Sequence, residues 1–142
     1  VVEEIGANAP ALPTAIEGGR EHILLVDDEE LVLEMTAGML EKLGYTVTKR
    51  LSSQEALKAF EAASERFDLV VTDQTMPGLT GRELAREIRR RCPDTPVVLC
   101  SGFSASFAEQ PNDTGDVAMQ LNKPVLMQEL ARTIRTALTT PN

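Results

Sequence analysis

The amino-acid sequence predicts an α/β fold, a doubly wound five-stranded parallel sheet with helices on both faces. Short apolar runs alternate strictly with helical stretches and form five β/α units. Such alternation favours a parallel sheet whose crossover connections are helices. In the first, third and fourth runs consecutive residues are apolar, instead of every second residue. That pattern is typical of strands covered on both faces.

The individual elements are placed by hydrophobic period and by turn residues. The expected strands are residues 23–26, 45–47, 69–72, 97–100 and 117–121, and the expected helices are residues 29–43, 53–63, 80–91 and 127–138. Ser52 with Glu55 and Thr80 with Glu83 have the spacing of capping boxes, which start helices. Residues 103–115 are predicted to be a poor helix because Ser, Pro, Asn and Gly interrupt them.

Length and composition limit the domain organisation and exclude several functions. The chain has 142 residues, enough for one core, and residues 1–20 have the Gly and Pro content of a linker or tail before a domain at 21–140. The net charge of −8 repels nucleic acid and anionic lipid. No stretch reaches the roughly 20 apolar residues of a membrane span. Cys92 and Cys100 lack metal-ligand spacing and are expected to be reduced thiols of a cytoplasmic protein.

Polar side chains that could carry chemistry follow four of the expected strands. Asp27 and Asp28 follow the first strand, Asp73 the third, Ser101 the fourth and Lys123 the fifth. In a parallel sheet these strand ends share one edge, where ligands bind. Three carboxylates at one place repel each other, so a cation is expected, and hard oxygen ligands favour Mg²⁺. A carboxylate beside a metal ion and an ammonium can attack phosphorus to form an aspartyl phosphate.

Four motifs at these strand ends resemble the receiver domains of two-component signalling, over about residues 21–140. The motifs are Leu25-Val26-Asp27-Asp28-Glu29, Asp73-Gln74-Thr75-Met76-Pro77-Gly78, Ser101-Gly102 and Lys123-Pro124. Each motif alone is weak, whereas four in this order are a strong signal. The resemblance implies a flavodoxin-like sheet with the strand order 2-1-3-4-5.

The resemblance also implies a role for each residue. Asp73 would accept the phosphoryl group from a phosphohistidine of a histidine kinase or a histidine phosphotransfer domain. Mg²⁺ would be bound directly by Asp28, Asp73 and the backbone carbonyl of Thr75, and through water by Asp27. The residues that would contact the phosphoryl oxygens are Lys123 and Ser101. The isolated domain would catalyse nothing beyond its own phosphorylation and dephosphorylation.

Two other functions are compatible with parts of this pattern. An aspartate-nucleophile phosphatase of the haloacid dehalogenase type also uses a strand-end Asp, Mg²⁺ and a Lys. The motif of that family, however, has a second Asp two residues after the nucleophile. Here Glu29 and Thr75 occupy that spacing after Asp27 and Asp73. The other alternative is a receiver-like scaffold that binds a partner without being phosphorylated, and the complete set of site residues is against it.

The remaining chemistry-bearing residues are interpreted as structural. His22 precedes the first strand and therefore lies at the opposite end of the sheet from the site. The basic side chains of the third helix are expected on a solvated face: Arg82, Arg86, Arg89, Arg90 and Arg91.

The position of the linker bears on the parent protein. The linker precedes the domain, and the chain ends four residues after Leu138, which favours the C-terminal receiver of a hybrid sensor histidine kinase. The alternative is a stand-alone regulator with a 20-residue tail. The domain is expected in the cytoplasm without membrane contact, the parent kinase could be membrane-anchored, and self-association into a homodimer stays open.

The sequence departs from the receiver pattern three residues before Lys123. Many receivers have Tyr or Phe there, a ring that turns inward on activation, whereas this chain has Gln120. Burying an unpaired amide costs about 1–3 kcal/mol, so an aromatic switch at this position is excluded. We expect the signal to pass instead through ordering or shifting of residues 102–115.

Overall fold

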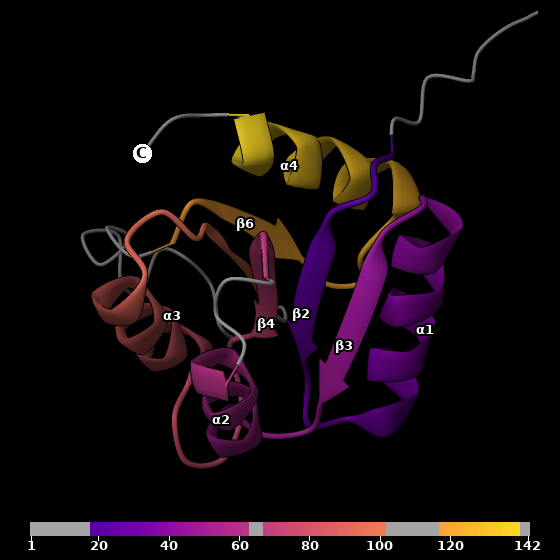
Figure 1. Ribbon diagram of the computed structural model, residues 1–142. Coiled ribbons are helices and arrows are strands. Elements are labelled where there is room, and N and C mark those ends of the chain that lie inside the picture. Colours follow the sequence, from indigo (N-terminus) through magenta and orange to yellow (C-terminus); the bar gives the residue numbers. More distant parts are fainter. Residues whose placement is uncertain (1–17, 63–66, 102–116, 140–142) are drawn as a thin grey trace, which may run out of the picture.

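The structure is a computed structural model that describes residues 18–62, 67–101 and 117–139. The described residues contain five strands and four helices, which alternate along the chain as far as residue 101 (Figure 1). The strands are β2 (His22–Val26), β3 (Thr46–Arg50), β4 (Leu69–Asp73), β5 (Val97–Ser101) and β6 (Met119–Asn122). The helices are α1 (Glu30–Lys42), α2 (Ser53–Ala62), α3 (Gly81–Arg91) and α4 (Met127–Thr139).

The strands form one parallel sheet in the order β3-β2-β4-β5-β6. This order confirms the predicted doubly wound sheet. Because successive side chains of a strand point to opposite faces, β2 contributes alternately to two cores. Ile23 and Leu25 pack with α1 and α4, whereas Leu24 and Val26 pack with α2 and α3. The helices accordingly cover the sheet in two pairs (Figure 1).

Two strands differ from their expected bounds by more than one residue. β3 extends to Arg50 instead of ending at residue 47, because the edge strand stays in register with all of β2 despite its polar sequence. β6 begins at Met119 rather than at Val117. The Val117 side chain is buried in the core instead, and backbone pairing starts when the Ala118 amide donates to the Val97 carbonyl at 2.8 Å.

The start of α3 confirms one predicted capping box and corrects one prediction. Thr80 Oγ1 accepts from the Glu83 amide, and Glu83 Oε1 accepts from the Thr80 amide. Arg82, which was expected on a solvated face, is buried with only 7% of its surface exposed. It sits in the first turn of α3, where the helix packs close behind the end of β4, so the helical period alone gave the wrong face.

His22 lies at the amino-terminal ends of the strands, the end of the sheet opposite the predicted site, as predicted. The His22 ring lies 4.6 Å from the Phe67 ring, and its Nε2 is 2.7 Å from Thr48 Oγ1. Both cysteines are free. Residues 102–115, on which the predicted switch depends, lie outside the described residues, and so do residues 1–17 of the expected linker.

Candidate functional site

The carboxyl ends of four neighbouring strands bring the predicted site residues to one edge of the sheet. Asp27 follows β2, Asp73 ends β4, Ser101 ends β5, and Lys123 follows β6. The backbone hydrogen bonding between β5 and β6 continues to Lys123, because the Lys123 amide donates to the Ser101 carbonyl at 2.9 Å. Parallel pairing thus fixes the spacing of side chains that are up to 96 residues apart in sequence.

Three carboxylates gather at this edge. One oxygen from each of Asp27, Asp28 and Asp73 lies within 4.8 Å of the others. Asp27 and Asp73 are buried, with 5% and 6% of their surface exposed, whereas Asp28 is exposed. Asp27 is held locally, because its Oδ1 accepts from the Glu29 amide at 2.9 Å. The cluster therefore has two fixed carboxylates and one that faces solvent.

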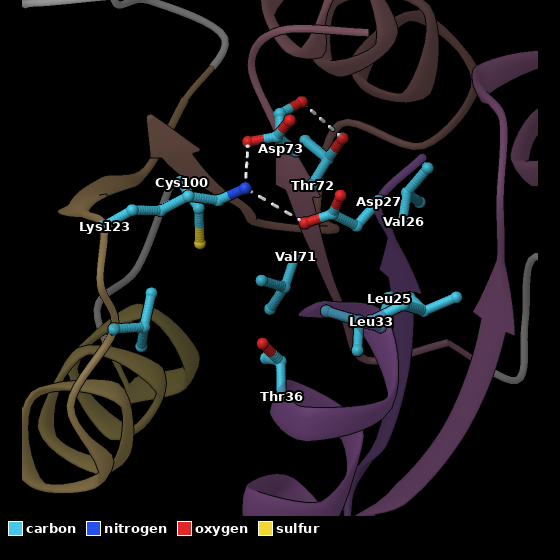
Figure 2. Close-up of a pocket in the computed structure, with 11 residues that line it drawn as sticks. Leu25, Val26, Asp27, Leu33, Thr36, Val71, Thr72, Asp73, Cys100 and Lys123 are labelled. Atoms are coloured by element: carbon cyan, nitrogen blue, oxygen red, sulfur yellow. Dashed lines mark hydrogen bonds and ion pairs between the residues drawn. The ribbon is translucent and has the colours of Figure 1, made fainter. Parts of the chain in front are cut away.

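Lys123 places its ammonium group between the two buried carboxylates (Figure 2). Its Nζ is 2.8 Å from Asp73 Oδ1 and 3.1 Å from Asp27 Oδ2. One positive charge thus stands against the three negative charges of Asp27, Asp28 and Asp73. The imbalance favours a further cation, and the hard oxygen ligands are those that Mg²⁺ prefers. The donor set fits Mg²⁺.

Burial and charge shift the ionisation of these groups. Burial raises the pKa of Asp73; the Lys123 ammonium opposes that rise, and the charges of Asp27 and Asp28 add to it. Burial would lower the pKa of Lys123, but its hydrogen bonds and charge interactions with Asp73 and Asp27 outweigh this and raise it. Lys123 therefore stays protonated, while the ionised form of Asp73 is disfavoured in the metal-free protein.

The Ser101 hydroxyl is held in the site without a partner. Ser101 has 1% of its surface exposed, and among the described residues its Oγ is the one buried side-chain polar atom without a hydrogen bond. An unsatisfied buried hydroxyl costs stability, so its presence at this edge indicates a group kept available for a ligand.

The floor of the site is almost closed. A cavity of about 10 Å³ lies beneath Asp27, Asp73 and Lys123, lined by apolar side chains together with Thr36 and Cys100 (Figure 2). This volume holds at most about one water molecule. Burial raises the pKa of Cys100 to about 12, so this thiol stays protonated and unreactive. A ligand therefore reaches the carboxylates from the solvent side.

The loop after Asp73 positions the predicted carbonyl ligand Thr75. Thr75 is exposed, as a metal ligand at the rim would be. Helix α3 begins close behind, because a Cβ added to Gly81 would lie 2.4 Å from the Asp73 carbonyl oxygen. Only glycine allows this approach. The sequence motif contains Gln74 but gives it no role, and Ser53 lies outside the motifs. The side chains of both residues fasten the same loop to a helix, Gln74 to α3 and Ser53 to α2.

Comparison with known proteins agrees with this geometry. The profile of the response regulator receiver domain family matches residues 23–135. The sensor kinase CckA of Brucella abortus is 36% identical over 121 residues, which are 84% of this chain and 13% of that kinase. The chain therefore corresponds to a small part of that relative.

Solved structures show the same fold. A response regulator receiver domain protein from Clostridium thermocellum superposes with a TM-score of 0.78 at 31% identity, covering 83% of this chain and 94% of that one. The response regulator TrrA from Thermotoga maritima, solved in complex with Mg²⁺ and BeF, has a TM-score of 0.74 at 30% identity and covers 83% and 99%.

No helix among the described residues is long and apolar enough to cross a membrane.

The family match spans most of the chain, and the strand order and the acidic edge agree with it. The chain belongs to the response regulator receiver domain family of two-component signalling.

Proposed function

We propose that Asp73 of this receiver domain is phosphorylated in a Mg²⁺-dependent reaction. The observation that carries the proposal is the contact of Asp73 with the Lys123 ammonium beside the unpartnered Ser101 hydroxyl. These two groups are the donors that a phosphoryl group on Asp73 would need. Transfer of a phosphoryl group depends mainly on positioning and on neutralising charge.

In this reaction an Asp73 oxygen attacks phosphorus. The phosphorus–nitrogen bond of a phosphohistidine donor breaks, and its electron pair stays on the imidazole, which takes up a proton. Asp28 and Asp73, with the Thr75 carbonyl, would hold Mg²⁺ directly and Asp27 would hold it through water. The metal ion supplies positive charge to the transferring oxygens. Lys123 turns from Asp73 toward a phosphoryl oxygen, and Ser101 donates to another.

The TrrA complex with Mg²⁺ and BeF supports this assignment, since that protein shares the fold and 30% of its residues. The donor would be a histidine kinase or a histidine phosphotransfer domain in the cytoplasm. The likeness to the sensor kinase CckA favours a hybrid kinase as the parent protein. The length of the complete gene product distinguishes this parent from a stand-alone regulator.

The test is phosphorylation by acetyl phosphate, measured by intact mass. We expect about one phosphoryl group per chain with Mg²⁺, none in excess EDTA, and none on D73N. Glu21→Gln, which changes a carboxylate at the opposite end of the sheet, is the control that should be labelled like the wild type. Labelling of D73N, or labelling in EDTA, would contradict the assignment of Asp73. Steady turnover of a generic phosphate ester would indicate the phosphatase alternative instead.

The proposed switch is tested by amide hydrogen exchange. Phosphorylation adds roughly −1.5 to −2 charges, and Ser101, whose buried hydroxyl has no hydrogen-bond partner, directly precedes residues 102–115. We expect that addition of fluoroberyllate with Mg²⁺ changes protection most within 102–115. A response confined to other residues would show that the signal leaves through another surface.

A further inference from the structure

The loop between Asp73 and α3, residues 74–80, is fixed at both ends. At its start Gln74 accepts twice from the first turn of α3: its carbonyl from the Gly81 amide and its Oε1 from the Arg82 amide, both at 3.0 Å. At its end Thr80 closes the capping box with Glu83. The first amides of α3 are therefore satisfied by residues of the loop itself.

The middle of the loop is fastened from a different helix. Ser53, the first residue of α2, donates its hydroxyl to the Leu79 carbonyl at 2.7 Å. Ser53 is fully buried, so water does not compete for its hydroxyl in the folded protein. Gly78 has φ of +78°, a conformation that favours glycine. A hydrogen bond across 26 residues thus holds the loop just after its left-handed turn.

The neighbouring serine has a different task. Ser52 Oγ accepts from the Glu55 amide at 3.1 Å and so caps α2. The Ser53 hydroxyl donates away from its own helix, into the loop. Stabilising the helix start and holding the loop are therefore divided between two adjacent residues of the same type.

We propose that Ser53 is a positioning residue for the metal site. The loop that Ser53 holds contains Thr75, whose carbonyl is the proposed ligand two residues after Asp73, and residues that hold a ligand from behind influence metal affinity. Without the hydroxyl the Leu79 carbonyl loses this hydrogen bond to α2, so the loop shifts or opens. This inference rests on the proposed Mg²⁺ binding and adds a residue from α2 to that site.

The experiment compares S53A with S52A in the otherwise unchanged chain. The chain has no Trp, so Mg²⁺ affinity is measured by isothermal titration calorimetry. Amide exchange in the metal-free protein reports the loop itself. We expect S53A to weaken Mg²⁺ binding about 10-fold, the lower end of the range for residues that hold a metal ligand from behind. Exchange within 74–80 should become faster before any metal is added.

S52A is the matched control, because it removes a helix cap and lowers the melting temperature by roughly 3–5 °C without touching the loop. Its Mg²⁺ affinity should stay within about 2-fold of the wild-type value, below the effect of an outer-shell residue. Equal weakening by both variants, or unchanged affinity in S53A, would overturn the role of Ser53. A wild-type protein that does not bind Mg²⁺ would instead refute the proposed function. S53C keeps most of the side-chain volume with only a weak S–H donor and replaces S53A if that variant does not fold.

Discussion

The two edges of the sheet both contain charged groups, but these groups are arranged in opposite ways. At the amino-terminal edge Arg135 Nη1 donates to both carboxylate oxygens of Glu21, at 3.0 and 3.1 Å, and lies 3.4 Å from the Tyr45 hydroxyl. At the carboxyl-terminal edge the Lys123 ammonium is shared by Asp27 and Asp73. The Glu21–Arg135 pair is balanced, while the cluster at the carboxyl-terminal edge has excess negative charge.

The ionisation of one carboxylate at each edge shows the consequence. Burial alone would raise the pKa of Glu21, but hydrogen bonds from backbone amides and from Arg135, with the charge of Arg135, lower it. For Asp73 burial and the neighbouring carboxylates outweigh Lys123, and the pKa is raised. The fold therefore stabilises the ionised form of Glu21 and disfavours the ionised form of Asp73. The charged Asp73 lowers the stability of the protein at the place where a cation and a phosphoryl group are expected.

The largest effect should follow removal of the shared ammonium. In K123M the buried carboxylates of Asp27 and Asp73 lose their counter-ion, and breaking such a partly buried pair should lower the free energy of unfolding by about 2–3 kcal/mol at pH 7 without metal. Mg²⁺ should restore part of this loss because it neutralises the same carboxylates. Urea unfolding with and without Mg²⁺ measures both. A loss that Mg²⁺ leaves unchanged would mean that Lys123 acts through packing.

A smaller effect of opposite sign is expected for D73N. At pH 7 and without metal, removing the disfavoured charge should raise stability on the order of 1 kcal/mol, or roughly 3–5 °C in Tm. Because the pKa of Asp73 is raised in the folded state, its charge destabilises the protein only as the pH rises from 3.8 through that folded pKa. Below this window wild type and D73N should be equally stable. Thermal unfolding from pH 3 to pH 7 measures the difference, and a less stable D73N at pH 7 would contradict the comparison.

Most of the fold and of the site could be predicted because both follow from periodic features. Apolar runs such as Val97–Ser101 locate the strands, and residues that immediately follow them, such as Asp27 and Lys123, must meet at one edge. The strand order came from the resemblance, since alternation alone does not say which strand lies beside which.

Contacts made by side chains at irregular positions could not be predicted. The burial of Arg82 depends on how closely α3 approaches Asp73, a distance that the Gly81 contact sets. The hydrogen bond of Ser53 to Leu79 joins two helix-end regions 26 residues apart, and no local pattern signals it. Such contacts decide the shape of the loop around the site and become visible only in three dimensions.

At the amino-terminal edge, removing the cation should matter less than at the site. R135M should lower the free energy of unfolding by about 1 kcal/mol, the upper range for a partly exposed ion pair, because the partly exposed Glu21 carboxylate can then turn to solvent. Mg²⁺ bound at the intact carboxylate cluster should stabilise R135M and wild type equally, so the difference between them should not change when Mg²⁺ is added. Urea unfolding beside K123M is the direct comparison. A difference between R135M and wild type that changes with Mg²⁺ would show that the metal ion acts outside the carboxylate cluster.

The smallest effect should come from Glu21 itself, and its pH dependence distinguishes the edges. Because the pKa of Glu21 lies below its ordinary 4.5 in the folded protein, its charge contributes stability above pH 4.5, and this is lost as the pH falls through the folded pKa. E21Q should therefore be less stable than wild type by about 0.5 kcal/mol at pH 7 and equally stable at the acid end. D73N should be more stable than wild type at pH 7, and this difference should vanish as the pH falls. Plotted against pH, the stability differences of E21Q and D73N from wild type should therefore have opposite signs. If E21Q kept its full deficit at pH 3, the Glu21 side chain would stabilise the edge by its uncharged contacts, and charge balance would not be what separates the two ends of the sheet.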